Sequence, residues 1–322
     1  MTYPLINDYK HAVVNPKGRF VSLDISPLRD SRNAPILLAG NFAGVFKVQD
    51  AKGQVLALKC FTRDIAQLTR RYQAVADFIR TAQSPYFLPM KFHPEEIFIT
   101  SSTAPHRDYP VATMPWLEGR SLGAMTEALC AAKKRQALAG LTIAWSRLCQ
   151  DLLKRGIAHG DLKHDNVFVS STEGKLKLLD YDSMYLPKLK GLSSPVLGSV
   201  NFQHPLRNTK HFDETIDHFS MLVILLSLRA LVFEPELFAQ FHNGENLIFS
   251  REHFLTPESA ALVARLAKSP DIFVRDWTQA LVKASKSRAI SVPGLAAMLK
   301  TATKLDATPA QSRHTGILSF FS

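Results

Sequence analysis

One run of residues constrains the fold more than any other. The stretch from Phe219 to Phe233, FSMLVILLSLRALVF, is apolar at nearly every position. A helix that is apolar on all sides belongs in a protein core. The run is short for a membrane span, which needs about 20 apolar residues, and it contains Ser227 and Arg229. It therefore predicts a buried core helix and no membrane segment.

The composition fits an intracellular globular protein. The chain has 322 residues, of which 46% are hydrophobic, enough for one large or two medium domains. Cys60, Cys130 and Cys149 lie far apart and match no zinc spacing, so we interpret them as buried thiols in a reducing compartment. The first residues carry no apolar stretch of the signal-peptide kind. We expect a cytoplasmic protein.

The net charge of +11 raises the question of an acidic partner. Lysines and arginines are scattered along the chain, and the dense clusters are short, such as Lys133–Arg135. This distribution favours a diffuse basic surface with a few lysines facing a bound polyanion. Nucleic acid is therefore not the expected partner.

The first part of the chain is strand-rich. Residues 36–61 predict two or three strands with a hairpin turn at residues 50–54. Residues 84–100 and 109–119 predict further strands, which prolines interrupt. Between them, residues 64–81 predict one helix. Its expected apolar face comprises Ile65, Leu68, Tyr72, Val75, Ala76 and Ile79.

The second part is mostly helical. Residues 135–156 predict a long helix that ends at a glycine, and a strand follows at residues 175–180. The change of character near Trp116–Gly119 indicates two lobes. A cleft between lobes is a natural ligand site. The fold class we expect is α+β.

A polar stretch, HGDLKHDN at residues 159–166, concentrates catalytic types of side chain. Asp161 suits a base that orients a hydroxyl group and accepts its proton. Lys163 is placed to steady a transferring phosphoryl group. Asn166 and Asp180 offer the oxygen ligands that magnesium prefers. We interpret His159 as a packing residue and His164 as a surface residue.

Two upstream features suit a nucleotide. Lys59 ends the strand VLALK, where its ammonium group can reach phosphates. The small-residue turn AGNFAGV, residues 39–45, can bring backbone N–H groups close to phosphates.

Taken in their order along the chain, these motifs resemble those of the protein-kinase family. AGNFAGVFKV is similar to the glycine-rich loop, LALK to the lysine strand, HGDLKHDN to the catalytic loop and DYD to the DFG element. LGSVNFQHP resembles the end of an activation segment, and DHFSMLVILL the central helix whose leading acid, Asp217, holds the catalytic loop. Residues 286–299 resemble the closing segment that contains an arginine.

The resemblance implies a bilobal fold and a set of ligands. Residues 1–35 form an extension, 36–116 the small lobe, 117–302 the large lobe and 303–322 a tail. ATP and Mg²⁺ are the implied cofactors, with Met114 lining the adenine pocket and Trp116 offering its backbone. The implied catalytic residues are Asp161, Lys163 and Asn166, the metal ligands are Asn166 and Asp180, and the nucleotide contacts are Gly40, Asn41, Phe42, Ala43, Val45, Lys59, Met114 and Trp116.

The phrases GNFAGVFKV, KCFTRD and LLDYDSMYLP are similar to those of bacterial eukaryotic-like Ser/Thr kinases. That resemblance implies a protein substrate and a regulatory role. It also implies partners with phosphatase or von Willebrand-type domains.

The chain departs from the family pattern at several places. Leu38 and Ala43 stand where the loop has glycines, Gly160 replaces the catalytic-loop arginine and Asp182 replaces the DFG glycine. Leu206 stands where a glutamate follows the activation segment.

The glutamate of the small-lobe helix is also missing, since no Glu occurs between Lys59 and Pro94. Gln73 is our candidate substitute, with Asp77 pointing further towards solvent and Asp64 serving as a helix N-cap.

Three functions stay open. The first is a Ser/Thr protein kinase. The second is a small-molecule phosphotransferase of the aminoglycoside or choline kinase type, which HGDLKHDN and LLDYD suit but the activation-segment motif opposes. The third is a pseudokinase, which the missing Glu favours and the full set of catalytic residues opposes. The tail at residues 316–322 is either a docking peptide or a segment that folds back or stays disordered.

Overall fold

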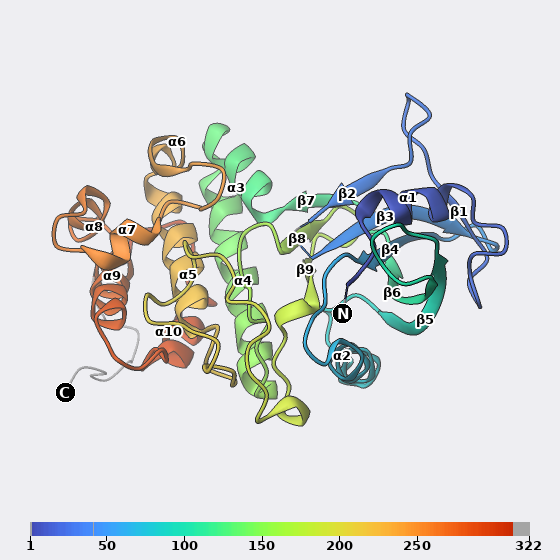
Figure 1. The fold of residues 1–322 in the computed structure, drawn as a ribbon. Helices are drawn as coiled ribbons and strands as arrows, with labels where there is room; N and C mark the ends of the chain where they lie inside the picture. The colour runs from blue at the N-terminus through green and yellow to red at the C-terminus, as the bar shows by residue number, and fades with distance from the viewer. Residues whose placement is uncertain (1, 41, 312–322) are drawn as a thin grey trace. The chain divides into compact units, whose positions relative to one another are not determined.

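The computed structural model describes residues 2–40 and 42–311. The chain forms two compact units, Met1–Glu118 and Gly119–Ser322. The first contains a curled antiparallel sheet with two helices, and the second is mainly helical (Figure 1). The α+β fold class expected from the sequence is confirmed.

The sheet of the first unit is antiparallel throughout its described pairings, in the order β1-β3-β4-β6-β5, with β2 also paired to β3. The hairpin expected at residues 50–54 joins β3 to β4, where Gly53 adopts a φ of 81° and the Asp50 N–H donates to the Gln54 carbonyl. The strands are β1 (Ile25–Pro27), β2 (Leu37–Ala39), β3 (Ala43–Asp50), β4 (Val55–Phe61), β5 (Lys91–Ile99) and β6 (Arg107–Pro115).

Both edges of this sheet are tied to one short segment, which explains its curl. Phe20 bridges to Ile97 of β5, while β1, a few residues later, pairs with β3 at the opposite edge. The buried carboxylate of Glu96 fastens the segment by accepting hydrogen bonds from the N–H groups of Ser22 and Leu23. A sheet whose two edges are held this way is bent towards a barrel.

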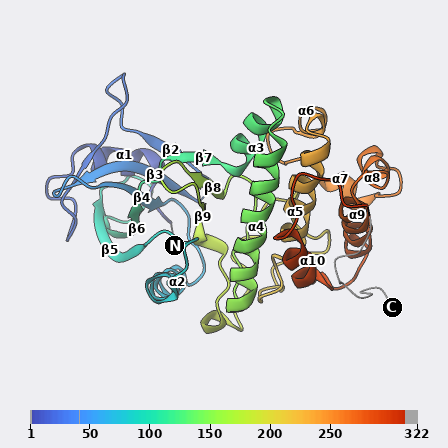
Figure 2. The same cartoon turned by 180° about the vertical axis from the view of Figure 1, so that it is seen from behind.

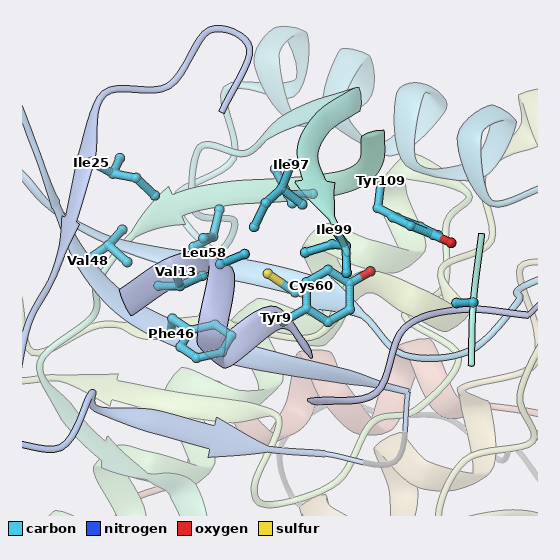
Figure 3. Close-up of a cluster of buried hydrophobic side chains, with 13 residues drawn as sticks. Tyr9, Val13, Ile25, Phe46, Val48, Leu58, Cys60, Ile97, Ile99 and Tyr109 are labelled. Carbon is cyan, nitrogen blue, oxygen red and sulfur yellow. The ribbon is translucent and has the colours of Figure 1, made fainter. Parts of the chain in front are cut away.

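Helix α1 (Ile6–Val14) covers one face of the sheet and lies within residues 1–35, which we expected to form an extension. Tyr9, Ala12 and Val13 recur at helical spacing and are buried. The core beneath it is shown in Figure 3 and comprises Tyr9, Ala12, Val13, Ile25, Phe46, Val48, Leu58, Cys60, Ile97, Ile99, Ala104, Tyr109 and Val111.

Helix α2 (Leu68–Ala82) packs on the opposite face, where the Tyr72 ring lies 4.7 Å from that of Phe61. The expected apolar face is confirmed at Leu68, Tyr72, Val75 and Ala76, which are buried. The expected N-cap is wrong, because the helix begins after Gln67, which adopts a φ of 59°, three positions beyond Asp64.

The second unit is organised around α5 (His218–Phe233), the helix predicted from the apolar run. All of its residues from Phe219 to Phe233 are buried. Helix α4 (Arg135–Arg155) runs beside α5 in both views and ends at Gly156, as expected, with a φ of 62° (Figure 2). The others are α3 (Leu122–Ala131), α6 (Glu236–Phe241), α7 (Arg251–Leu255), α8 (Ala261–Leu266), α9 (Ile272–Ser285) and α10 (Leu295–Ala302).

An antiparallel three-stranded sheet carries the polar motifs of this unit. Its strands are β7 (Gly119–Ser121), β8 (Val167–Ser170) and β9 (Leu176–Leu178), so the strand expected at residues 175–180 is present but shorter. Two 3₁₀ turns follow it, at Tyr181–Ser183 and Pro187–Leu189.

Arg229, the charged residue in the apolar run, forms a buried ion pair. Its Nη2 lies 2.6 Å from Oδ2 of Asp271, and both side chains are almost fully buried. The guanidinium also donates to the carbonyls of Asp306 and Thr308, and the Ala310 N–H donates to Asp271 at 2.9 Å. This pair therefore fixes residues 306–310 against α5 and α9.

Two further expectations concern the end of the chain and the membrane. The possible docking peptide at residues 316–322 lies outside the described residues. Within residues 2–40 and 42–311, no helix combines the length and the apolar character needed to span a bilayer.

Candidate active site

In the first unit, strand register places several predicted nucleotide contacts on one face of the sheet. Val45 pairs with Lys59, and Lys59 pairs with Ala112. Met114 lies on the same strand face two residues beyond Ala112 and pairs with Ala57. Because paired residues share a face, these side chains are neighbours. This is the face opposite the core under α1.

The predicted phosphate loop is the tight turn between β2 and β3. The Gly40 N–H donates to the Ala43 carbonyl at 2.9 Å, and Phe42 accepts a hydrogen bond from the Thr62 N–H. The guanidinium of Arg63 lies 5.6 Å from the Phe42 ring. Asn41, another predicted contact, lies outside the described residues.

Lys59 is buried beside an aromatic ring. Its side chain is 7% exposed, and its Nζ lies 5.9 Å from the centre of the Tyr72 ring on α2. A cation over an aromatic face is stabilised by the ring quadrupole. The sequence placed Tyr72 on the apolar face of α2 but gave no sign of this role.

Gln73 does not replace the missing glutamate. Its side chain is exposed, and its Nε2 donates to Asp77 on the same helix at 3.3 Å. The expectation is wrong because residue 73 follows Tyr72 directly, and neighbouring positions on a helix point in different directions.

Met114 and Trp116 follow one another at the end of β6. Met114 is half-buried, as a pocket wall requires. The Trp116 N–H donates to the Val55 carbonyl at 3.0 Å, which extends the strand ladder. The backbone contact expected from Trp116 is therefore limited to its carbonyl oxygen.

In the second unit, Asp217 holds the backbone of the catalytic loop. Its Oδ2 accepts a hydrogen bond from the His159 N–H at 2.5 Å, and its Oδ1 accepts one from the Gly160 N–H at 2.9 Å. Burial raises the pKa of this carboxyl group, while His159, Arg207 and the two N–H groups oppose the rise. Asp217 precedes α5 but makes no capping bond with its side chain.

His159 joins this loop to the end of β9, which confirms its packing role. Its Nε2 lies 2.7 Å from the Leu179 carbonyl, an acceptor, so Nε2 carries the proton. Its Nδ1 is then free to accept from the Asp161 N–H, at 3.4 Å. The ring is fully buried, so it is not a base facing substrate.

Asn166 and Asp180 come together through the small sheet. Val167 pairs with Leu178, and the Leu179 N–H donates to the Asn166 carbonyl. The two residues therefore stand at neighbouring ends of paired strands. Asp180 adopts a φ of 63°, an uncommon backbone conformation for a residue other than glycine.

The carboxylate of Asp161 is held at both oxygens. Oδ2 accepts from Nδ2 of Asn166 at 3.0 Å, and Oδ1 accepts from the Ser199 N–H at 2.9 Å. A Cβ atom on Gly198, where φ is 77°, would lie 2.7 Å from Oδ1. Only glycine allows the segment at residues 197–205 to approach the carboxylate this closely.

The oxygen atoms of Asn166 and Asp180 suit a magnesium ion that is bound together with a nucleotide. Mg²⁺ is usually held by one or two protein oxygens together with phosphates and water. The Nδ2 of Asn166 is bonded to Asp161, which leaves Oδ1 on the far side of the amide. The described residues contain no cluster of three or more His, Cys, Asp or Glu side chains suited to a metal.

Packing explains why residue 160 is a glycine and why His164 is buried. Gly160 adopts a φ of 84°, and a Cβ atom there would lie 2.2 Å from the Ser183 carbonyl oxygen, so no arginine fits. His164 is not a surface residue as expected but is 2% exposed. Its ring stacks on Phe202 at 5.4 Å and fills the space that a side chain at Gly123 would occupy.

Other groups fix the segment at residues 197–205. His204 is buried, and its Nε2 donates to the Ala284 carbonyl at 2.8 Å. Arg207, which the sequence did not single out, donates to Gln203 and to the Ser194 hydroxyl. The arginine of the closing segment, Arg288, is exposed. Ser194 is buried and bonded, whereas Ser193 is exposed.

Comparison with known proteins gives distant relatives of one kind. No protein-family model matches the chain. Serine/threonine-protein kinase WNK2 of Mus musculus is 25% identical over 231 residues, which is 69% of this chain and 10% of that protein. Serine/threonine-protein kinase WNK3 of Mus musculus is 22% identical over 299 residues, or 89% of this chain and 15% of that protein.

A shorter match is closer in sequence. Serine/threonine-protein kinase Wnk of Drosophila melanogaster is 31% identical over 94 residues, or 29% of this chain and 4% of that protein. The chain spans about a tenth of the length of the first curated relatives it matches. Its sequence and its curled sheet are thus similar to those of Ser/Thr protein kinases, which supports a kinase-like fold and a place among the phosphotransferases.

Proposed function

We propose that the chain is a Ser/Thr protein kinase that uses ATP and Mg²⁺. The observation that carries this is the support of Asp161. The Asp217 carboxylate anchors the loop backbone, and Asn166 and the Ser199 N–H each hold one oxygen of Asp161. A carboxylate held beside two candidate metal ligands is suited to phosphoryl transfer, where positioning and charge supply most of the catalysis.

We assign each of these residues a role in the transfer. Asp161 orients the acceptor hydroxyl and takes its proton as that oxygen bonds to the terminal phosphorus of ATP and the bond to ADP breaks. Lys163 neutralises charge on the phosphoryl group. Asn166 and Asp180 would hold Mg²⁺, which offsets charge on the phosphate oxygens when bound. In the first unit, Lys59 would hold the α- and β-phosphates.

A peptide acceptor is favoured over a small molecule by the surface next to Asp161. Leu197 and Val200, which flank Gly198 and Ser199, are 39% and 50% exposed, and Leu206 is 52% exposed. Exposed apolar side chains next to a catalytic group are typical of a surface that binds another chain. A site for an amino alcohol or an aminoglycoside needs polar groups there instead.

The finer features of the proposal come from the motif resemblance. They are a bacterial regulatory role, a cytoplasmic location, and partners with phosphatase or von Willebrand-type domains. Cys60, Cys130 and Cys149 are buried free thiols, as suits a reducing compartment.

A nucleotide-binding pseudokinase is the second candidate, and α2 is the reason. Helix α2, with the sequence LTRRYQAVADFIRTA, contains no glutamate. A kinase usually pairs its lysine with a glutamate from this helix.

The test compares acceptors with ATP labelled at the γ-phosphate. The protein is incubated with Mg²⁺ and either generic protein substrates or a panel of amino alcohols and aminoglycosides. Label on serine or threonine of a protein is expected. Label on a small molecule would overturn the protein acceptor, and nucleotide binding without any transfer would establish the pseudokinase.

A further inference from the structure

Helix α1 contacts β3 where that strand leaves the predicted phosphate loop, and it contacts β4 where β4 pairs with the same end of β3. Gly44 is the second residue of β3, and it pairs with Cys60 of β4. A Cβ atom on Gly44 would lie 1.9 Å from Cδ1 of Ile6. The Ile6 side chain therefore occupies the space that any side chain at residue 44 would need. Gly44 has no positive φ, so packing and not backbone geometry excludes a larger residue.

A second contact lies one helical turn further along α1. The hydroxyl of Tyr9 donates to the Phe61 carbonyl at 2.7 Å, and Tyr9 is fully buried. Phe61 pairs with Ala43, the first residue of β3. Residues three apart on a helix lie on the same face, so Ile6 and Tyr9 together cover the start of β3 and the end of β4 that pairs with it.

Helix α1 is also fixed to the chain just after β5, the strand at one edge of the sheet. Oδ2 of Asp8 accepts hydrogen bonds from the Leu5 N–H at 3.0 Å and from the Ser101 hydroxyl at 2.8 Å. Ser101 follows β5. The contacts of α1 therefore link the start of β3 and the end of β4 to an element at the sheet edge, and a well-packed core transmits small displacements.

Strand geometry connects these contacts to the nucleotide face. Side chains alternate along a strand, so Gly44 faces α1 while Ala43 and Val45 face the opposite side. Val45 pairs with Lys59, which shares that opposite face. Displacing the backbone at Gly44 thus displaces both of its neighbours.

We propose that α1 positions the phosphate loop, with Ile6 and Tyr9 as the positioning residues. This inference rests on the proposed nucleotide site. Loosening α1 then weakens nucleotide affinity even though α1 contributes no side chain to the nucleotide face of the sheet.

The first experiment measures the packing contact and needs no activity. Melting temperatures are compared for the full chain and for Gly44→Ala, Ile6→Ala and the double variant. We expect Gly44→Ala to lower the melting temperature in the wild-type chain and to leave it unchanged or higher in the Ile6→Ala chain, because the added methyl fills the vacated space. Additive effects of the two substitutions would overturn the contact.

The second experiment measures the consequence, using Mg²⁺ with ATP and isothermal titration. Ile6→Ala and Tyr9→Phe are expected to weaken ATP binding about fivefold or more. Ile25→Ala is the matched control. Ile25 is 4% exposed in the same core but pairs with Asp50 at the other end of β3. In Figure 3 it lies on the Val48 side of the cluster and Tyr9 on the Cys60 side.

The outcomes separate this inference from the proposed function. If wild type and Ile25→Ala bind ATP and the α1 variants bind it equally well, the positioning role is wrong and the nucleotide site stands. If Ile25→Ala weakens binding as much as Ile6→Ala does, the effect is general destabilisation and the positioning role is again wrong. If wild type binds no nucleotide, the proposed function and the positioning role both fail.

Discussion

Oδ1 of Asp161 accepts a hydrogen bond of 2.9 Å from the backbone N–H of Ser199. This bond joins the proposed base to the segment whose exposed apolar side chains would meet an acceptor peptide. The absence of a side chain at Gly198 makes the approach possible. A peptide bound on that segment would therefore present its hydroxyl group close to the base.

The anchoring of the catalytic loop predicts the effect of Asp217→Asn. The substitution replaces one accepting oxygen by an NH₂ group that faces a backbone N–H. We expect the free energy of unfolding to fall by about 1.5–3 kcal/mol, the usual worth of hydrogen bonds to a charged group. Urea denaturation measures this. An unchanged stability would show that the two bonds do not hold the loop.

Gly160 predicts a second effect on stability. Alanine at this position is strained by the left-handed backbone conformation, and its Cβ atom would displace the Ser183 carbonyl oxygen. We expect Gly160→Ala to cost about 3 kcal/mol or more. Gly174→Ala is the control, because Gly174 has a φ of 62° with no atom near its missing Cβ, and it should cost about 1–2 kcal/mol. Equal losses in both variants would contradict the packing argument.

The buried ion pair of Arg229 and Asp271 predicts a third effect on stability. Arg229→Met leaves the Asp271 carboxylate buried without its cation. We expect the free energy of unfolding to fall by about 3–5 kcal/mol. Arg265→Met is the control, since Arg265 pairs with Glu234 and Glu236 at the surface and such pairs are worth about 1 kcal/mol or less. Guanidinium unfolding compares the two variants. Similar losses would mean that burial of the Arg229 pair adds nothing.

His204 predicts how stability depends on pH. Its Nε2 donates to Ala284 and its Nδ1 accepts from the Leu206 N–H, so the folded state holds the neutral ring. Burial lowers the pKa of His204 in the folded chain. As the pH falls through about 6.5, the unfolded chain takes up a proton first, and the free energy of unfolding decreases.

His204→Gln tests this assignment, because glutamine can still donate to the Ala284 carbonyl but does not titrate. Unfolding free energies between about pH 5 and 8 should fall less steeply towards acid in the variant than in the wild type. Parallel curves would exclude His204 as a source of the acid sensitivity.

Strong local patterns made much of the second unit predictable. The apolar run at residues 219–233 and the periodic segment before Gly156 became α5 and α4, since a long pattern outweighs context. Asp161 and Asn166 were recognisable because their spacing fits one loop, and a hydrogen bond joins them. Asp217 was recognised from the resemblance of the segment at the start of α5, and its hydrogen bonds join it to that loop.

The errors concern which distant residue each side chain meets. The sequence could not show that His164 stacks on Phe202 or that Arg229 pairs with Asp271, because both partners lie far along the chain. Gln73 was chosen for its chemistry, but helix rotation turns it outward and places Tyr72 next to Lys59. Helix α1 was missed because its nine residues are too short a run for a helical period to stand out.

The central claim is that Asp161 takes part in transfer and not in nucleotide binding. The direct measurement is the intact mass of the protein after incubation with ATP and Mg²⁺, for wild type and Asp161→Asn, with ATP affinity measured alongside. The asparagine keeps an oxygen for the Ser199 N–H but cannot accept the proton. We expect added phosphate in the wild type, none in the variant, and similar ATP affinity in both. Equal phosphate gain in both proteins, or loss of ATP binding in a folded variant, would contradict the claim.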